Sequence, residues 1–338
     1  MVTVLLLGGS FGEMSDCPGL TQGAAACYNP RRVEAEEDRN GMVDWVRWGG
    51  DEGEQQSNLA CGMGSLSMIE NARDRFSAGA EAWSGYNRQP LGRIRHEVTW
   101  RNLIPHLPDL LDDEGPPRVL DAGGGSGELA LRLAQRGYRV WLLDYAPAML
   151  DQARQAALSL SNDARDRLTF CLLPADEASN AFSPGFFQMI TCHTLVEYLH
   201  QPQVTIGELA SLLSDGGLLS LSFVNRHAEV LRQVWSHGDP AGALDRLEDG
   251  SFDAGLFGIQ GEAYTAEEVS VWLPPLGLTV VEVCGVRAFA DQVPEDRLDE
   301  PEFLDALFRL ESAVARLEPY RRIARYIQLL AHKGLEHS

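Results

Sequence analysis

Apolar and polar positions follow two different periods along most of this chain. Short apolar runs, the pattern of buried strands, recur from residue 118 onward. Segments with apolar residues three or four positions apart, the pattern of helices, lie between several of these runs. The predicted strands cover residues 118–120, 139–144, 168–176, 187–195, 218–225, 278–289 and 325–333, and the predicted helices cover 128–136, 204–213, 265–273 and 303–317.

This alternation indicates an α/β fold. Strand-helix-strand units join by right-handed crossovers, which makes the strands parallel. We therefore predict a Rossmann-like, seven-stranded, mostly parallel sheet with helices on both faces and an antiparallel last strand.

Three regions differ in composition. Residues 1–70 are polar and charged with little periodicity, which predicts a disordered extension. Residues 71–117 have helical periodicity and form a lead-in that we expect to cover a cofactor. Residues 118–338 form the main domain. Within it, residues 226–262 break the alternation without a clear strand, and we interpret them as a lid or substrate-facing insertion.

The strand at 118–120 is followed by the pattern Asp121-x-Gly123-x-Gly125-x-Gly127, and a helix comes next. Glycines allow a sharp turn and let a ligand lie against bare main chain. The amino terminus of the helix adds oriented N–H groups. In an open α/β sheet this crevice is a cofactor site.

Two cofactors compete for such a loop. Dinucleotide sites use G-x-G-x-x-G to hold a pyrophosphate. Here an acid, Asp121, precedes the first glycine; it would repel a pyrophosphate and suits a cationic amino-acid group. The pattern therefore favours S-adenosylmethionine over NAD, and an ordinary strand-to-helix turn remains the alternative.

The end of the second strand supports a nucleoside ligand. Asp144 lies about 20 residues past the glycine loop, where an acid accepts both ribose hydroxyls. Tyr145 and Met149 follow and can flank an adenine. Core packing explains Met149 equally well.

Two further strands end in polar residues. Ala175 and Asp176 follow the third strand, and Asp176 either accepts the adenine amino group or caps a helix. His193 lies near the carboxyl end of the fourth strand. It faces the crevice if the strand order is the usual one for open sheets, and otherwise it is a hydrogen-bonded core histidine.

Net charge narrows the choice of partners. The chain has 28 Lys and Arg against 49 Asp and Glu, a formal charge of −21. This argues against non-specific binding to a nucleic-acid backbone and leaves room for a local basic patch. The dense basic cluster near the carboxyl end either contacts phosphates or balances nearby acids; it consists of Arg316, Arg321, Arg322 and Arg325.

The cysteines indicate a reducing compartment. Cys171, Cys192 and Cys284 lie in apolar strands and are expected to be buried free thiols. The spacing of the cysteines indicates no metal site. Apolar runs long enough to cross a membrane are absent from the sequence, so we expect a cytoplasmic protein without membrane association.

Four segments carry a family resemblance: VLDAGGGSGELA, CHTLVEYLHQP, CGVRAFADQ and LESAVARLEPYRRIARYI. From about Arg88 to Lys333 the chain resembles class I S-adenosylmethionine-dependent methyltransferases. More narrowly, it resembles the bacterial methyltransferases that esterify 5-carboxymethoxyuridine at the tRNA wobble position. The last two segments are the more specific, because most methyltransferases lack them.

The resemblance implies a set of cofactor residues. They are Arg95, Gly123, Gly124, Asp144, Ala175, Asp176 and His193, to which the loop and strand patterns add Asp121, Gly125 and Tyr145. Arg95 would pair bidentately with the cofactor's α-carboxylate.

The resemblance also implies methyl transfer to a carboxylate of tRNA. A carboxylate is ionised at neutral pH and needs no general base, so catalysis rests on orientation and exclusion of water. Arg287 and Arg226 are candidates for holding the acceptor carboxylate, and a salt bridge at the sheet edge is the alternative for Arg287.

Two other functions stay open. A small-molecule O- or N-methyltransferase on the same fold would use His193 as base. A non-catalytic cofactor-binding scaffold would recruit a partner through its acidic amino-terminal arm. Fold alone does not choose among these acceptors.

Overall fold

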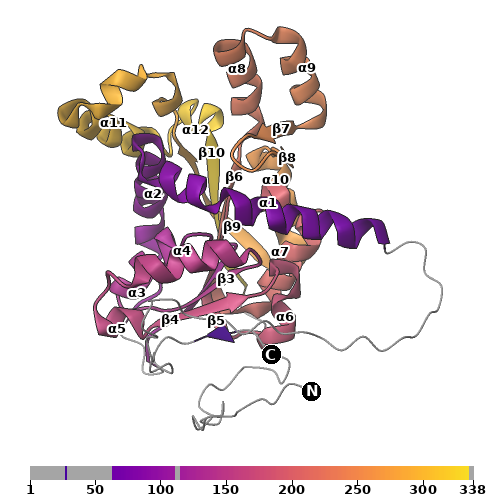
Figure 1. Ribbon diagram of the computed structural model, residues 1–338, viewed down its shortest axis with the longest axis vertical. Coiled ribbons are helices and arrows are strands. Elements are labelled where there is room, and N and C mark those ends of the chain that lie inside the picture. Colours follow the sequence, from indigo (N-terminus) through magenta and orange to yellow (C-terminus); the bar gives the residue numbers. More distant parts are fainter. Residues whose placement is uncertain (1–26, 29–62, 111–114, 335–338) are drawn as a thin grey trace, which may run out of the picture.

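The computed structural model describes residues 27–28, 63–110 and 115–334 (Figure 1). The disordered extension predicted for residues 1–70 therefore lies almost entirely outside the described residues. Its described parts are β1 (Cys27–Tyr28) and the start of α1 (Met63–Arg88), a helix that begins ahead of the boundary expected at residue 71.

The main sheet contains the seven predicted strands in the order β4-β3-β2-β5-β6-β10-β9. Their bounds are β2 (Arg118–Ala122), β3 (Arg139–Asp144), β4 (Leu168–Leu172), β5 (Phe187–His193), β6 (Leu213–Val224), β9 (Leu278–Val286) and β10 (Tyr326–Lys333). Strands β2 to β6 are mutually parallel, and β10 is antiparallel to both of its neighbours. The predicted fold class is thus confirmed. β1 pairs antiparallel with β4 and adds a two-residue strand at that edge.

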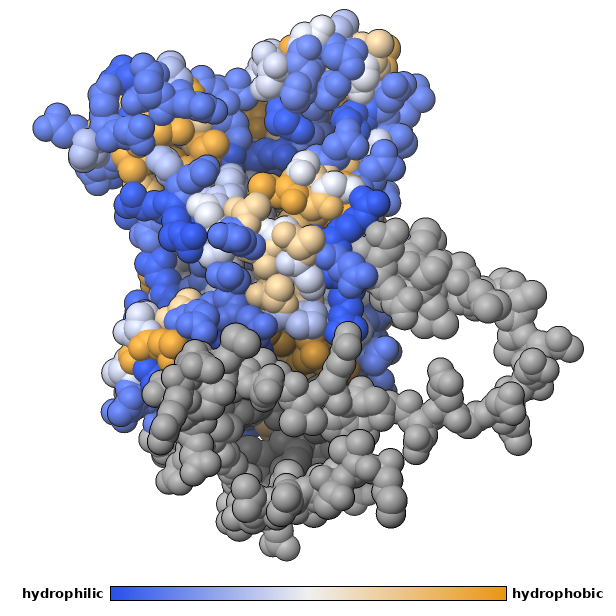
Figure 2. All heavy atoms as spheres, in the orientation of Figure 1, coloured by the Kyte–Doolittle hydropathy of each residue, from blue (hydrophilic) through white to orange (hydrophobic). Residues whose placement is uncertain are grey.

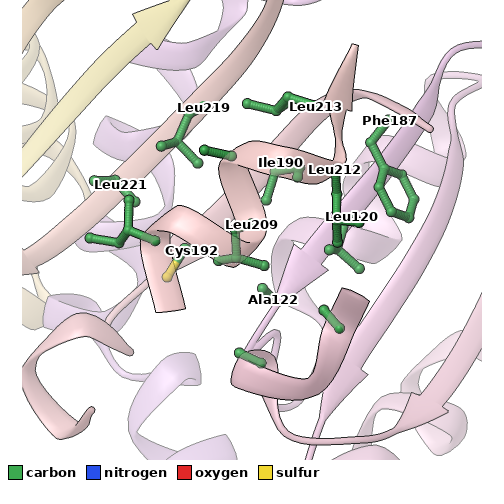
Figure 3. Packing of buried hydrophobic residues seen from close by; sticks show 14 of the residues in the cluster. Leu120, Ala122, Phe187, Ile190, Cys192, Leu209, Leu212, Leu213, Leu219 and Leu221 are labelled. Carbon is green, nitrogen blue, oxygen red and sulfur yellow. The ribbon is translucent and has the colours of Figure 1, made fainter. Parts of the chain in front are cut away.

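Helices cover both faces of this sheet. One face carries α2 (Pro90–Leu103), α3 (Glu128–Gln135), α4 (Pro147–Ala157) and α5 (Asn162–Arg165); the other carries α6 (Ala178–Ala181), α7 (Pro202–Leu212) and α10 (Ala266–Trp272). Figure 3 shows Leu209 of α7 packed among side chains of the central strands. Alternate residues of β2 serve the two cores, Val119 on the first face and Leu120 on the second, as strand geometry requires.

Chain order reverses between β2 and β5. The strands that follow β2 in sequence, β3 and β4, lie on one side of it, and β5 lies on the other. In open α/β sheets the crevice at the carboxyl ends of such strands binds ligands. The glycine loop, which follows β2, lies at this position.

The insertion has more structure than the sequence predicted. Residues 226–262 form α8 (Arg226–His237), α9 (Pro240–Asp249) and an antiparallel hairpin of β7 (Ser251–Ala254) and β8 (Ile259–Glu262). The expectation that no strand occurs here was wrong, because strands of four residues are too short to show a period. Gly238 and Gly250, both with positive φ, end the two helices.

Another correction concerns the start of β6. The sequence predicted a helix to residue 213 and a strand from residue 218, but β6 already begins at Leu213. Gly216 has φ +73°, and the pairing of β5 with β6 shifts register between Phe187 and Met189. A glycine in this conformation allows the strand to bulge and continue through the residues between the two predicted elements.

Two groups of helices rise from the carboxyl end of the sheet (Figure 1). One is the α8–α9 pair. The other lies between β9 and β10 and contains η7 (Ala290–Gln292), η8 (Glu295–Asp299), α11 (Pro301–Val314) and α12 (Tyr320–Ile323). The remaining short helices are η3 (Ile104–His106), η4 (Ala175–Glu177), η5 (Val196–Tyr198) and η6 (Pro274–Leu276).

The lead-in helices connect these groups to the sheet. α1 crosses the front of the molecule, and α2 turns back against α11 (Figure 1). The turn is tight, because a Cβ at Gly92 would lie 2.3 Å from the carbonyl oxygen of Tyr86. Ile94 and Val98 of α2 then pack into the core beneath α11.

The cysteine prediction holds in part. Cys192 and Cys284 are buried free thiols, as predicted. Cys171 is disulfide-bonded, so the prediction of a free thiol was wrong there; it lies opposite Cys27 in the pairing of β1 with β4. None of the helices among the described residues is both long enough and apolar enough to span a bilayer.

Candidate functional site

The glycine loop lies against the end of β3. The N–H groups of Gly123 and Gly124 both donate to the carbonyl oxygen of Leu143, over 2.7 and 3.1 Å. At Gly124 a Cβ would lie 2.8 Å from the Asp121 carboxylate. At Gly125, φ is +54° and the nearest atom to a Cβ would be Nε1 of Trp83, 3.4 Å away. The loop therefore presents bare main chain toward Trp83.

One half of the crevice has the shape and chemistry of a nucleoside site. It holds about 550 Å³ of space, part of it open to solvent. Asp144, Tyr145, Met149 and Ala175 line its walls, as the sequence predicted for an adenosine site. Four aromatic side chains also line it, Phe76 and Trp83 from α1, Tyr198 from η5 and Phe257 from the turn between β7 and β8.

Asp144 is held at the junction of the loop and β3. Its Oδ2 accepts from the N–H of Gly125 over 3.0 Å, and its Oδ1 accepts from the N–H of Ala146 over 2.8 Å. Burial raises the pKa of this carboxyl to about 6, against the lowering effect of the backbone donors. Each oxygen retains a lone pair, which suits a pair of ribose hydroxyls.

The other half of the crevice is polar. Arg95, Asp121, Gly124 and His193 line it, together with His96, Thr99, Glu128, Leu129 and Ser222. The two halves share Trp83, Gly123, Gly125 and Thr194, so they form one continuous crevice along the glycine loop.

Arg95 has an unsatisfied donor in this polar half. Its side chain is 5% exposed, and its guanidinium lies 4.4 Å from the ring centroid of Trp83. One terminal nitrogen, Nη2, donates to Oδ1 of Asn87 over 2.7 Å, whereas the buried Nη1 has no hydrogen-bond partner in the part of the chain that the structure describes. A buried guanidinium donor without a hydrogen-bond partner is stabilised when an anionic ligand group, such as an α-carboxylate, binds beside it.

Asp121 supplies the opposite charge. Its carboxyl is 3% exposed, and Oδ1 accepts from the Thr191 hydroxyl over 2.6 Å. Burial raises its pKa to about 7. A buried carboxyl with a raised pKa is stabilised by an incoming cation, such as an ammonium group. Arg95, Asp121 and Asp144 together fit an amino acid joined to a nucleoside, the composition of S-adenosylmethionine.

His193 lines the crevice, but its environment makes it a poor base. Nε2 lies 2.8 Å from Oγ of Ser220. Burial and, to a smaller extent, the charge of Arg95 lower the pKa of the imidazole to about 3. The ring is therefore neutral at physiological pH and binds protons weakly, which argues against the general-base role considered for it.

Backbone strain marks the same region. Among the described residues, two that are not glycine have positive φ, Thr194 at +50° and Arg287 at +63°. Thr194 lines both halves of the crevice. Strained backbone conformations concentrate at functional sites, and these two residues point to the crevice and to a second hollow beside it.

This second hollow, here called the acceptor cleft, lies between α8 and the segments 287–292 and 323–325. It holds about 320 Å³, and Trp235, 58% exposed, stands on its α8 wall. Arg287 and Arg325 lie in its lining. Arg287 pairs with both carboxylate oxygens of Asp291 and donates to the Tyr86 hydroxyl, while Arg325 pairs with Glu229.

A ring of arginines separates the cleft from the crevice. The guanidinium carbons of Arg95, Arg287 and Arg325 lie 5.7, 5.6 and 5.7 Å from the ring centroid of Tyr326. Arg95 lines the crevice and the other two line the cleft. Burial raises the pKa of the Tyr326 phenol, but the three guanidinium groups together lower this pKa by more than burial raises it. The net shift is therefore downward. The potential at this point is therefore positive.

Nine of the predicted cofactor residues line the crevice, and one does not. Asp176 lies in η4 with an exposed side chain, and it caps neither η4 nor α6. Arg287 lies at the acceptor cleft and not at the crevice. Arg226 lines neither, because it pairs with Glu268 over 2.8 Å and donates to the carbonyl of Ala263.

The carboxyl-terminal basic cluster is neutralised. Arg316 pairs with Glu282, Arg321 with Glu318, and Arg322 with both Glu318 and Glu267. The interpretation of these residues as balancing nearby acids is the one that the geometry supports. The carboxylate of Glu311 pairs with none of these three arginines; it accepts hydrogen bonds from the backbone N–H groups of residues 288–290.

The aromatic wall of the nucleoside half was not predicted from the sequence. Phe76 and Trp83 are seven residues apart on α1, which places them on one helix face, and this spacing was the available signal. Phe257 had no such signal. It reaches the crevice because the β7–β8 hairpin folds onto α1, where its ring centroid lies 4.5 Å from that of Phe76.

Comparisons with known proteins agree with this geometry. The model of a family described as a methyltransferase domain matches residues 93–283. The tRNA 5-carboxymethoxyuridine methyltransferase of Escherichia coli strain K12 is 32% identical over 247 residues, covering 72% of this chain and 89% of the relative. The ubiquinone biosynthesis O-methyltransferase of Xanthomonas campestris pv. campestris strain B100 is 37% identical over 109 residues, 32% of this chain and 44% of the relative.

Solved structures share the fold. A putative methyltransferase solved with the Trm112 activator of Haloferax volcanii superposes with a TM-score of 0.52 at 21% identity, covering 79% of this chain and 99% of that one. A possible histamine N-methyltransferase from Thermotoga maritima gives 0.51 at 14% identity, covering 77% and 99%. Given the family match and the crevice, the chain belongs to the class I S-adenosylmethionine-dependent methyltransferases, and its cofactor is S-adenosylmethionine.

Proposed function

We propose that this enzyme methylates the carboxylate of 5-carboxymethoxyuridine at the wobble position of tRNA. Two findings support the proposal. The E. coli relative, a tRNA 5-carboxymethoxyuridine methyltransferase, matches over most of its length. The acceptor cleft ends at a point of positive potential, which suits an anionic acceptor. The second finding carries the most weight, because it concerns this chain's own residues.

The ring of arginines is the specific observation. Three guanidinium groups surround Tyr326; among the described residues Asp291 and Glu229 form ion pairs with two of them, and the buried Glu197 lies within electrostatic range of Arg95 and Arg325. An acceptor carboxylate entering the cleft competes with Asp291 for the planar fork of Arg287, which binds carboxylates bidentately. A neutral acceptor would not compete for this fork. Arg226, the other candidate, lines neither the cleft nor the crevice.

The cofactor residues follow from the crevice. In this proposal the orphaned Nη1 of Arg95 binds the α-carboxylate, and Asp121 balances the ammonium group. Asp144 accepts the ribose hydroxyls, and Tyr145 flanks the adenine. Backbone groups near Ala175 contact the adenine edge, whereas the exposed Asp176 has at most a peripheral role. His193 contributes a neutral wall beside Arg95.

The reaction needs little proton chemistry. S-adenosylmethionine supplies a methyl group on a cationic sulfur. An acceptor carboxylate is already ionised at neutral pH, so no residue has to remove a proton. The chain's contribution is to orient the carboxylate through Arg287 and to exclude water with the aromatic wall of Phe76, Trp83 and Phe257. The proposal includes a cytoplasmic enzyme, as the substrate requires.

The test is methylation of a defined tRNA. Purified full-length protein is incubated with labelled S-adenosylmethionine and tRNA that carries 5-carboxymethoxyuridine, and wobble nucleosides are analysed by mass spectrometry. We expect the free acid to decrease as its methyl ester appears. A wobble nucleoside that stays unchanged, with the cofactor demonstrably bound, overturns the assignment.

One observation favours a second candidate, methylation of a small hydroxyl acceptor. Glu197 is 3% exposed, its carboxylate has no side-chain hydrogen-bond partner among the described residues, and burial raises its pKa to about 7 against the lowering effect of nearby backbone N–H groups. It precedes Tyr198, which lines the crevice. A carboxyl with a pKa near 7 can act as a base for a hydroxyl acceptor, and the Xanthomonas relative is an O-methyltransferase. Turnover of a panel of phenols, without turnover of the tRNA, would select this candidate.

A further inference from the structure

A tRNA acceptor needs a surface that binds phosphates, and the carboxyl-terminal arginines are already neutralised by acids. Another concentration of cations lies on α2, at the end of α1 and on α3. Five arginines form it, Arg88 at the end of α1, Arg93 and Arg101 on α2, and Arg132 and Arg136 on and just after α3. We call this surface the arginine face.

Few acids oppose these cations. Glu97 pairs with both Arg101 and Arg132, over 2.8 and 2.9 Å. Glu128 accepts from Asn87 and Ser126. Arg88, Arg93 and Arg136 are exposed, and none of them forms an ion pair with a described residue. Five arginines therefore lie beside three acids, Glu97, Glu128 and the exposed Asp109, which like Arg136 is close to the Tyr138 phenol, so the face has an excess of positive charge on a chain whose formal charge is −21.

Aromatic rings hold several of these arginines in place. The guanidinium groups of Arg132 and Arg136 lie 4.4 and 5.3 Å from the ring centroid of Trp100, and that of Arg101 lies 6.0 Å from Phe308. A guanidinium stacked by its face keeps its N–H edge available for an anion. Arg93 and Arg101 are eight residues apart on α2, about 12 Å along the axis. They can therefore contact different phosphates of one strand.

The arginine face adjoins the active site. A hollow of about 760 Å³, much of it open, lies among α2, α3 and α11 and is lined by Arg93, Arg101 and Arg132. It shares His96 and Glu128 with the polar half of the cofactor crevice. Arg88 is two residues from Tyr86, whose hydroxyl accepts from Arg287 at the acceptor cleft. Figure 2 shows hydrophilic residues covering α2 on this side.

We propose that the arginine face binds the phosphate backbone of the tRNA whose wobble nucleotide enters the acceptor cleft. The inference rests on the proposed function for the identity of the RNA. Its own support is the excess of cations, their stacked geometry and their position beside the site. Exposed guanidinium edges bind phosphate oxygens through charge-assisted hydrogen bonds, which favours an RNA backbone as the partner.

The test compares two double variants of the full-length protein. Arg93→Gln with Arg136→Gln removes two unpaired cations from the face. The matched control, Arg297→Gln with Arg309→Gln, removes two exposed arginines paired with Glu300 and Asp305 elsewhere. Binding of purified tRNA is measured by fluorescence anisotropy from 50 to 300 mM KCl, and the affinity for S-adenosylmethionine is measured by calorimetry.

We expect the face variant to bind tRNA at least ten-fold more weakly at low salt. Its slope of log affinity against log salt should fall by between about 1 and 2, because each lost phosphate contact removes nearly one released counterion. The control should keep the wild-type slope, and both variants should keep the wild-type affinity for S-adenosylmethionine, which shows that the fold and the cofactor site are intact.

The outcomes separate this inference from the proposed function. Equal slopes for the wild type and the face variant, or no tRNA binding by the wild type, overturn the inference. If the wild type methylates the wobble nucleoside while the slopes are equal, the proposed function stands and the proposal that the arginine face binds tRNA is wrong. If the slope falls as expected but no nucleoside is methylated, the proposal that the arginine face binds tRNA stands, and the proposed methylation of the wobble nucleoside is wrong.

Discussion

The N–H of Gly125 donates a hydrogen bond to Oδ2 of Asp144 over 3.0 Å. This bond joins the glycine loop after β2 to the acid at the end of β3, the two features on which the nucleoside half of the crevice depends. The other oxygen of Asp144 accepts from Ala146 at the start of α4. One buried carboxylate therefore sets the distance between the loop and the walls of the site.

Replacing Asp144 with Asn should loosen this junction. An amide has one acceptor oxygen for two N–H donors, and its NH₂ group would face a donor. We expect Asp144→Asn to lower the free energy of unfolding by about 1–3 kcal/mol and to weaken binding of S-adenosylmethionine at least ten-fold. Denaturant unfolding and titration calorimetry measure the two effects. Asp151→Asn, at an exposed acid on α4, is the control and should change neither.

Asp121 should make the stability of the cofactor-free enzyme depend on pH. Burial raises the pKa of its carboxyl to about 7 in the folded chain, whereas an unfolded Asp titrates near 4. Between these values the folded state holds a proton that the unfolded state has lost. The contribution of Asp121 to stability is therefore fully present below pH 4 and is lost as the pH rises toward 7.

Asp121→Asn isolates this effect, because Asn keeps an oxygen that can accept from Thr191. We expect the stability of the wild type relative to the variant to fall by at most about 1.4 kcal/mol per pH unit between pH 4 and 7. Unfolding in urea at several pH values measures the difference. A difference that is constant, or that grows with pH, would contradict a raised pKa.

Most of the sheet was predictable because its strands are buried on both faces. Continuous apolar runs such as Val119-Leu120 or the one ending in Asp144 leave little choice of structure. Packing decided the places where prediction failed. β6 continues through Gly216 because it pairs with β5, and β7 and β8 exist because they pair with each other. Neither fact is visible in a local sequence window.

The crevice was predictable where a strand end determines it, and not where distant elements meet. Asp121, Asp144 and His193 lie at the carboxyl ends of β2, β3 and β5, whose order in the sheet is the usual one, so their common position could be inferred. Phe257 and Tyr86 depend on how α1 packs against the hairpin and against Arg287. Asp176 was predicted at the crevice but does not line it. The end of a strand determines where the backbone lies and does not determine where an exposed side chain points.

Phe257 should hold the β7–β8 hairpin against α1 and so close the nucleoside half of the crevice. Its ring lies 4.5 Å from Phe76 and 5.6 Å from Trp83, centroid to centroid, and only 8% of the residue is exposed. Phe257→Ala should cost about 3 kcal/mol of packing and detach the hairpin from α1. We expect S-adenosylmethionine to dissociate at least ten-fold faster, as measured by stopped-flow fluorescence.

Replacement of an exposed apolar residue with alanine is the control for Phe257→Ala. Leu247→Ala lies on α9, where the leucine is 52% exposed. Its dissociation rate should equal that of the wild type. If Phe257→Ala also releases the cofactor at the wild-type rate, the hairpin does not close the crevice.

Arg287→Lys tests how the acceptor is held. Lysine keeps the positive charge and the positive-φ backbone, but it cannot pair with both oxygens of Asp291 while donating to Tyr86. If Arg287 binds the acceptor carboxylate through its planar fork, the KM for tRNA should rise about 30-fold while the affinity for S-adenosylmethionine stays the same. Initial rates at varied tRNA concentration, together with calorimetry of the cofactor, provide both values. Arg226→Lys is the matched control, since Arg226 pairs with Glu268 away from both hollows. A rise in KM for Arg226→Lys and none for Arg287→Lys would move the acceptor carboxylate from the cleft to the start of α8.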